Sequence, residues 1–255
     1  MTRRERFIDL VVWAVAHVVV LPLLYLPPLR MRRRGTEHVP RTGPVLIVCN
    51  HVSVCDPIVL TAAARPRRTA MMAKAELFGN PFAAVMLRLV RAFPIRRGVG
   101  DVSAIRHALA LLEAGECIVV FPEGHVSRTG HMRRGHPGAG FFALRPGVTV
   151  VPAIAWDTQL FRGPVRVVFG PPIDMGGITG ASRKARNRAA TDRIMTALCR
   201  MAIDAGAPLQ DPPVGPIRPK DLTRGFVEPE PVLNPAWLDA TAEPSAPTGA
   251  ARARR

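Results

Sequence analysis

Cysteine, lysine, tyrosine and acidic residues are all scarce in this chain of 255 residues. The four cysteines form no C-x-x-C pair, and three of them stand in apolar runs; they are Cys49, Cys55, Cys117 and Cys199. Zinc knuckles and a disulfide framework are therefore disfavoured, and we expect small buried side chains in a reducing compartment. Hydrophobic residues make up 48% of the chain, which excludes a disordered or collagen-like protein and allows a sizeable core.

The charge balance is strongly one-sided. Acidic residues number 19 against 35 basic ones, so the formal net charge is +16. A charge of this size predicts a polyanionic partner, which is nucleic acid, an anionic membrane surface or a phosphorylated substrate. Nucleic acid is disfavoured, because aromatic residues are only 5% of the chain, with one tyrosine, and no nucleic-acid reading motif is present.

A long uncharged apolar run over residues 10–29 indicates membrane attachment. As a helix it would measure about 30 Å, just enough to cross a bilayer core. A cleaved signal peptide is disfavoured because no small-residue cleavage site follows, and a buried core helix is disfavoured by the arginine clusters on both sides. A single spanning helix and a segment that dips into one leaflet, with a bend near Pro22, both remain open, and the dipping form is favoured. We expect a protein bound to the cytoplasmic face of the cell membrane.

The chain divides into three parts. Residues 1–34 are the predicted anchor with its basic flanks, residues 35–205 a folded domain, and residues 206–255 an irregular tail that holds ten of the 26 prolines. In the domain, short apolar runs alternate with helical patterns. Strands are expected at Val45–Cys49, Thr69–Ala73, Ala92–Ile95, Cys117–Phe121, Val148–Ala155 and Val165–Phe169, and helices at Phe78–Val90, Val102–Ala114 and Ser182–Ala205. This alternation predicts an α/β fold with a mixed, largely parallel sheet flanked by helices.

The pair His51 and Asp56 follows the first of these strands. Residues five apart on a helix point about 140° away from each other, so the two side chains meet only if His51 lies in the turn before a helix. Pro57 suits the first helical position, with Asp56 as the N-cap. The carboxylate would then orient the imidazole and raise its basicity, as a general base requires. The alternative is that Asp56 only caps a helix and His51 is a polar loop residue.

Four sequence blocks appear in a fixed order over residues 45–155. They are N-H-V-S-V-C-D at 50–56, F-P-I-R-R-G at 93–98, F-P-E-G at 121–124 and V-V-P at 150–152. Together they resemble the glycerolipid acyltransferases typified by 1-acylglycerol-3-phosphate acyltransferase. Lesser matches at Ala73–Phe78 and Phe169–Ile173 extend the resemblance to about two thirds of the chain.

The resemblance implies an acyl transfer that needs no cofactor. His51 would be the general base and Asp56 its orienting residue. The donor would be an acyl-CoA or an acyl-carrier protein. The acceptor would be a lyso-phospholipid, most often 1-acylglycerol 3-phosphate, which gives phosphatidic acid. Backbone N–H groups near the first block are expected to stabilise the oxyanion. Ser53 is interpreted as a turn-former, since no G-x-S-x-G elbow surrounds it.

The resemblance also implies a set of substrate-binding residues, with Arg97 as the best match to the family's phosphate-binding arginine. The predicted set is Asn50, Ser53, Lys74, Arg96, Arg97, Glu123, Gly124, Ser127 and Arg128. The third block departs from the usual F-P-E-G-T-R-S, because His125 and Val126 replace the threonine and the arginine. Arg128, or Arg133 and Arg134, is then a candidate source of the lost charge.

Three alternatives follow from these residues. The departure at Val126 raises the possibility of a different lyso-phospholipid or a glycolipid as acceptor. A protein of the same fold that binds anionic lipid without catalysis is the competing class. Three histidines within 12 residues, at positions 125, 131 and 136, suggest a metal site, but their spacing matches no known pattern, so none is predicted.

Overall fold

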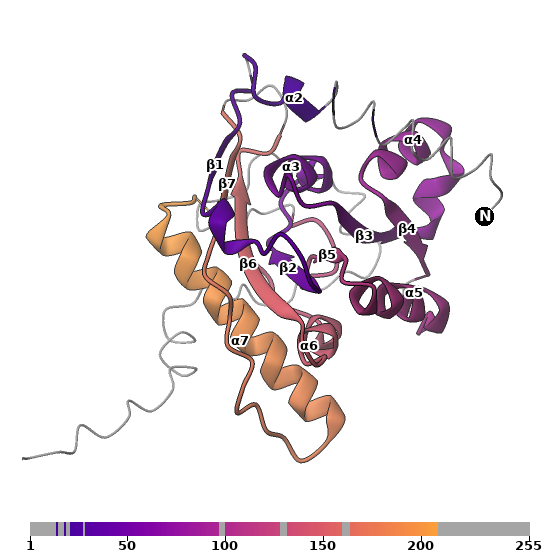
Figure 1. Cartoon of the computed structure of the whole chain (residues 1–255), viewed down its shortest axis with the longest axis vertical. Helices are drawn as coiled ribbons and strands as arrows, with labels where there is room; N and C mark the ends of the chain where they lie inside the picture. The colour runs from indigo at the N-terminus through magenta and orange to yellow at the C-terminus, as the bar shows by residue number, and fades with distance from the viewer. Residues whose placement is uncertain are drawn as a thin grey trace, which may run out of the picture.

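The computed structural model describes residues 14, 18, 21–27, 29–96, 100–127, 132–159 and 164–208. Within these residues, seven strands form one sheet in the order β1-β7-β6-β2-β5-β3-β4 (Figure 1). The strands are β1 (Arg32–Arg34), β2 (Val45–Cys49), β3 (Thr69–Lys74), β4 (Ala92–Ile95), β5 (Cys117–Val120), β6 (Thr149–Trp156) and β7 (Arg166–Phe169).

The central strands of the sheet are parallel. Strands β6, β2, β5, β3 and β4 run in one direction. Strand β7 is antiparallel to β6, and β1 is parallel to β7, so these two strands run in the opposite direction. In the middle, Ile47 of β2 lies opposite Val119 of β5 and Val151 of β6. A strand with neighbours on both edges is buried throughout, which explains why β2 is the uninterrupted apolar run VLIVC. The shared direction also brings the carboxyl ends of these five strands to one edge of the sheet.

Helices cover both faces of the sheet. One side carries α2 (Leu21–Leu23), α3 (Asp56–Ala63) and α4 (Pro81–Leu89), and the other carries α5 (Val102–Glu113), α6 (Pro137–Ala143) and α7 (Arg183–Asp204) (Figure 1). Successive residues of β2 divide between two hydrophobic cores. Ile47 and Cys49 pack into the core that contains α3, whereas Leu46 and Val48 pack into the one that contains α5, α6 and α7. The fold is thus a three-layer α/β sandwich.

The predicted α/β sheet, mixed and largely parallel, is confirmed, with differences at particular elements. Helix α4 begins at Pro81 instead of residue 78, because the Asn80 side chain accepts the Ala83 N–H and caps it there. The residues before it, Ala75–Gly79, form the 3-10 segment η3. Strand β1 and helix α6 are not predicted by the sequence. β1 is three exposed arginines on a sheet edge, and α6 contains two glycines, so neither has the expected apolar pattern.

The predicted anchor lies mostly outside the described residues, but its last part is described. Leu24, Leu29 and Met31 are buried in the α3-side core. The Tyr25 hydroxyl donates a hydrogen bond to the carbonyl of Ala62. Leu24, Tyr25, Leu29 and Met31 therefore pack with the domain that was expected to begin at residue 35. Among the described helices, none has the length and hydrophobicity to cross a bilayer.

Three of the four cysteines are buried as expected, and Cys55 is half-buried. Burial raises the pKa of the Cys117 and Cys199 thiols to about 12. These two thiols are therefore unreactive at neutral pH, consistent with a structural role. The predicted tail falls mostly outside the described residues, which end at 208, four residues beyond α7.

Two glycines in α6 provide a test of the packing between α6 and α7. A Cβ on Gly140 would lie 2.0 Å from the carbonyl oxygen of Asn187, whereas one on Gly138 would have nothing within 4 Å. We expect Gly140→Ala to lower the free energy of unfolding by about 1–3 kcal/mol, because the helices must separate. Gly138→Ala is the matched control and should stabilise by up to about 1 kcal/mol, the usual gain of alanine over glycine in a helix. Chemical denaturation of both variants measures this, and equal effects would contradict the close approach.

Candidate active site

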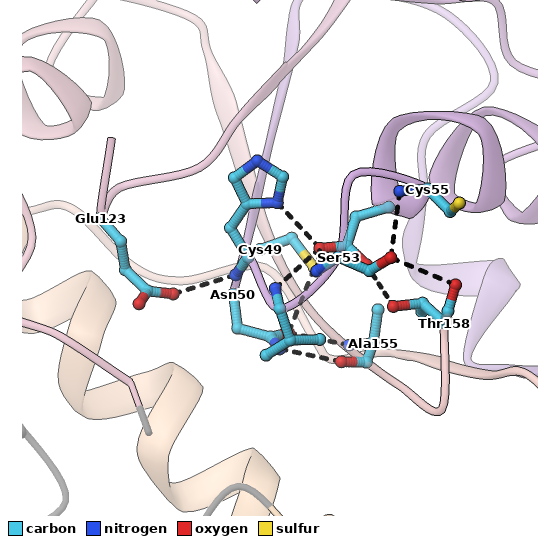
Figure 2. Close-up of polar contacts among 10 residues, drawn as sticks. Cys49, Asn50, Ser53, Cys55, Glu123, Ala155 and Thr158 are labelled. Carbon is cyan, nitrogen blue, oxygen red and sulfur yellow. Dashed lines mark hydrogen bonds and ion pairs between the residues drawn. The ribbon is translucent and has the colours of Figure 1, made fainter. Parts of the chain in front are cut away.

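Polar residues gather where the carboxyl ends of β2, β5 and β6 meet. Asn50 and His51 follow β2, Glu123 lies three residues beyond β5, and Thr158 lies two residues beyond β6. In open α/β sheets this edge is where ligands bind, because loops from adjacent strands converge there. Figure 2 shows these segments together, with Glu123 on one side of Asn50 and with Ser53 and Thr158 on the other.

His51 and Asp56 are in direct contact. The distance from His51 Nδ1 to Asp56 Oδ2 is 2.8 Å. The Asp56 side chain is fully buried, and the His51 side chain is 12% exposed. Because the carboxylate accepts at Nδ1, that nitrogen carries the proton, and Nε2 keeps the lone pair that can take a proton from another molecule.

The turn between β2 and α3 brings the two residues together in a way that differs from the prediction. The N-cap of α3 is Cys55, and Asp56 is the first helical residue, so Asp56 does not cap the helix. Its carboxylate turns back toward the loop, where Oδ2 also accepts the backbone N–H groups of Val52 and Ser53, both at 2.8 Å. The Thr158 hydroxyl donates to Oδ1. Four donors thus hold one buried carboxylate and, through it, the imidazole.

Phe121 and Thr158 are site residues that the sequence analysis missed. The Phe121 ring stacks on the His51 ring, with centroids 4.0 Å apart and planes 18° apart, and so fixes the imidazole plane. Phe121 is the first letter of the F-P-E-G block, which was the available signal. Thr158 is 102 residues from Asp56 along the chain, and no pattern in a single sequence links the two.

Glu123 ties the third block to the first. Its Oε1 accepts the backbone N–H of His51 at 2.9 Å, and its Oε2 accepts the backbone N–H of Arg133 at 3.0 Å. The side chain is fully buried. Desolvation by burial raises the pKa of Glu123 from its usual 4.5 to about 8, against the opposing effect of the two N–H donors. Both oxygens are occupied, so the geometry gives this predicted substrate-binding residue a loop-holding position.

Four other predicted substrate-binding residues also support the loops. The Asn50 amide exchanges two hydrogen bonds with the Ala155 backbone, both at 2.8 Å. The Ser53 hydroxyl accepts the Cys55 N–H at 3.1 Å, in agreement with its interpretation as a turn-former. The Ser127 N–H donates to the His51 carbonyl at 2.6 Å. Gly124 has a φ of +75°, and a Cβ there would lie 2.8 Å from a carbon of the His136 ring.

The predicted phosphate-binding residues lie farther along the same edge. Lys74 is the last residue of β3, and Arg96 directly follows β4; these strands are two and three places from β2 in the sheet. At a strand spacing of about 4.8 Å, this separates them from the β2 end by roughly 10 and 14 Å. Lys74 pairs with Glu76 at 3.4 Å, and Arg96, whose side chain is 75% exposed, pairs with Asp101 at 3.6 Å. Arg97 and Arg128 lie outside the described residues.

His125, one of the two residues that depart from the usual third block, pairs with a buried arginine. Arg133 is only 4% exposed, and its guanidinium donates to His125 Nε2 at 2.5 Å. A ring nitrogen that accepts this bond is not protonated, so His125 is neutral in this arrangement. Among the residues that the structure describes, no three histidine, cysteine or acidic side chains gather as a metal site; His131 lies outside that set.

The backbone of the first block has few free donors. The N–H groups of His51, Val52, Ser53 and Cys55 are all taken by side chains, those of Glu123, Asp56 and Ser53. The expectation that N–H groups of this block stabilise an oxyanion is therefore not met by these four. What remains available at the centre of the site is Nε2 of an oriented histidine, a group suited to general-base catalysis.

Comparison with known proteins supplies the family. The family model described as Acyltransferase matches residues 30–156, about half of the chain. The 1-acyl-sn-glycerol-3-phosphate acyltransferase of Bacillus subtilis (strain 168) is 29% identical over 163 residues, 62% of this chain and 81% of that protein. The enzyme of the same name from Borreliella burgdorferi is 28% identical over 141 residues, 54% of this chain and 56% of that protein.

A solved structure agrees with the fold. The crystal structure of the 1-acyl-sn-glycerophosphate acyltransferase from Thermotoga maritima has a TM-score of 0.54 and 20% sequence identity, covering 79% of this chain and 84% of that one. At this identity the likeness establishes the fold, and the sequence matches establish the family. The chain belongs to the glycerolipid acyltransferase family and is an enzyme that transfers acyl groups.

Proposed function

We propose that this enzyme transfers a fatty acyl group from an acyl thioester to the free hydroxyl of 1-acylglycerol 3-phosphate and so makes phosphatidic acid. The contact between His51 and the buried Asp56, at 2.8 Å and at the carboxyl edge of the sheet, carries the proposal. The names of the matched relatives support the choice of acceptor. Acyl-CoA and acyl-carrier protein are both suitable donors, since each presents the same thioester.

The proposed mechanism is direct transfer. Nε2 of His51 takes the proton of the acceptor hydroxyl as the oxygen attacks the thioester carbonyl, and a tetrahedral oxyanion forms. The C–S bond then breaks, and the leaving thiolate accepts the proton from the imidazolium, which gives the ester and a free thiol. The Asp56 carboxylate stabilises the imidazolium between the two steps. Because both substrates are held together, no acyl-enzyme is needed.

Arg97 is proposed to bind the acceptor phosphate, with Arg96 and Lys74 as further cations on the same sheet edge. Forked guanidinium donors suit a phosphate group. A second acceptor class, a lyso-phospholipid with a larger headgroup or a glycolipid, is favoured by one observation. Val126 stands where the family has an arginine, and the nearby Arg133 is buried against His125. Membrane attachment at the cytoplasmic face, through the part of the apolar run 10–29 that precedes the buried Leu24, completes the proposal.

Replacing the proposed base tests the reaction. We expect His51→Ala to lower kcat by about 10²–10⁴-fold, the usual contribution of a general base. The measurement is acceptor-dependent release of free thiol from oleoyl-CoA, with detergent-purified protein and 1-acylglycerol 3-phosphate. His107→Ala, an exposed histidine on α5, is the control and should keep native turnover. Near-native turnover by His51→Ala would refute the mechanism, provided that its thermal unfolding midpoint matches that of the wild type.

Acceptor competition separates the two candidate acceptors. With equal concentrations of 1-acylglycerol 3-phosphate and 1-acylglycerophosphoethanolamine, we expect at least about a tenfold preference for the former, because a dianionic phosphate gains more from paired cations than a phosphodiester does. Mass spectrometry of the diacyl products measures the ratio. A preference for the larger headgroup would support the second class. Thiol release from neither acceptor, with acyl-CoA or with acyl-carrier protein, would favour a lipid binder without catalysis.

The raised pKa of Glu123 predicts how stability depends on pH. The unfolded carboxyl ionises near 4.5 and the folded one near 8, so between these values the folded state holds a proton that the unfolded state has lost. Stability is therefore fully present below pH 4.5 and falls as pH rises toward 8, by at most about 1.4 kcal/mol per pH unit. Urea titrations from pH 4.5 to 8 measure the slope.

Matched variants isolate this group from others that titrate in the same range. Glu123→Gln cannot ionise and should lose that part of the slope, while starting about 1–3 kcal/mol less stable because its amide can accept from only one of the two N–H groups. Glu113→Gln, on the exposed side of α5, should leave the slope unchanged. Identical slopes for Glu123→Gln and the wild type would show that Glu123 is ionised throughout the range.

A further inference from the structure

Helix α4 has the composition of a core helix but lies largely exposed. Its sequence is PFAAVMLRL, with one charged residue in nine, and Leu89 is its only buried member. The Phe82 side chain is 74% exposed and that of Val85 is 47% exposed. A surface helix normally turns an apolar stripe inward and polar residues outward. An apolar helix face that stays open marks a surface that contacts something else.

Other exposed apolar side chains lie on the same side of the sheet. Leu23 and Leu26, at 52% and 55% exposed, belong to α2 and the turn after it, and Leu77, at 47%, belongs to η3. Val54, at 79%, stands in the loop that carries His51. Figure 1 shows α2, α3 and α4 along one side of the molecule, with α5, α6 and α7 along the other. We call the first side the α2–α4 face.

The charge around this face restricts what can cover it. Residues 21–96, the segment that contains α2, α3, η3 and α4, hold twelve arginines and lysines and only three acidic residues. One of the three, Asp56, is buried, and another, Glu76, is paired with Lys74. Exposed basic side chains on this side include Arg33, whose guanidinium donates to the carbonyls of Ala63 and Arg65, and Arg88 of α4. A second copy of the same face would be repelled, whereas an anionic surface would be attracted.

We propose that the α2–α4 face is a membrane-docking surface: Phe82 and Val85 of α4 insert into the interface of an anionic phospholipid bilayer, and the surrounding arginines contact its headgroups. This inference rests on the proposed function, because docking serves to bring the enzyme to a lipid acceptor. An apolar stripe with basic neighbours is the usual form of an interfacial helix. The docking would bring Val54 and the His51 loop to the surface that holds a lyso-lipid acceptor. Helix α4 is separate from the anchor predicted over residues 10–29, whose Leu23 and Leu26 lie on the same face.

Fluorescence quenching with labelled cysteines tests the contact in the full chain. Val85→Cys and Val102→Cys form a matched pair, because both valines are about half exposed, at 47% and 57%, but lie on opposite sides of the sheet. Each is labelled with a nitrobenzoxadiazole maleimide, and the wild type labelled in parallel corrects for Cys55. With vesicles of equal parts phosphatidylglycerol and brominated phosphatidylcholine, we expect at least about twofold quenching at position 85 and none at position 102.

Two results would overturn the docking surface. One is an unquenched label at position 85 in protein that sediments with the vesicles, since the protein would then bind through other segments only. The other is a blue-shifted label at position 85 without lipid, which would show that a second copy or another part of the chain already covers α4. Sedimentation equilibrium at two protein concentrations distinguishes these two occupants.

An activity measurement keeps this inference separable from the proposed function. We expect Phe82→Asp to lower turnover of 1-oleoylglycerol 3-phosphate presented in anionic vesicles by about tenfold, and to leave turnover of a short-chain, monomerically dispersed acceptor unchanged. Val102→Asp should affect neither. Equal turnover by wild type and Phe82→Asp in vesicles would refute the docking surface. If the wild type turns over no acceptor, the proposed function fails, while the quenching result still decides whether α4 contacts the membrane.

Discussion

The carboxylate of Asp56 is the interaction on which the carboxyl edge of the sheet depends. It is fully buried and receives the ring N–H of His51, two backbone N–H groups and the Thr158 hydroxyl. A buried charge without such donors costs several kcal/mol. The loop after β2 and the residues after β6 must therefore come together for the domain to be stable. The hydrogen bond that orients His51 is one of the four that the buried carboxylate needs. The need to satisfy this carboxylate therefore governs both the stability of the domain and the geometry of the base.

Much of this arrangement can be read from the sequence, because local spacing carries it. The apolar run of β2 indicates a central strand, and Pro57 directly after Asp56 indicates a helix start close enough for His51 to reach it. The atoms that complete the site cannot be read in the same way. Thr158 contacts Asp56 across 102 residues, and Phe121 stacks on His51 only because β5 is the neighbour of β2. The F-P-E-G motif predicts a glutamate at position 123, but it does not predict that this carboxylate accepts two backbone N–H groups.

The two acidic residues of the site and the excess of basic residues occupy different environments. Asp56 and Glu123 are fully buried and use their oxygens inside the protein. Most of the arginines that the structure describes are exposed, so the charge they carry acts mainly on the surroundings. Composition alone predicts a polyanionic partner and gives it no location. The structure adds that α4, with its exposed Phe82 and Val85, belongs to the segment 21–96, which holds twelve of the 35 basic residues.

The contrast between a buried site and a basic surface explains how an acyltransferase can avoid hydrolysing its donor. A general base that accepts a proton from an alcohol also accepts one from water, and the thioester reacts with either, so selectivity requires that water be kept from Nε2 of His51. The His51 side chain is 12% exposed, and Phe121 and Asp56 cover one ring face and one ring edge. Val54 stands in the same loop as His51, and its side chain is 79% exposed. A lipid surface against that loop would replace water near His51 with the acceptor itself, so docking and chemical selectivity would follow from the same contact.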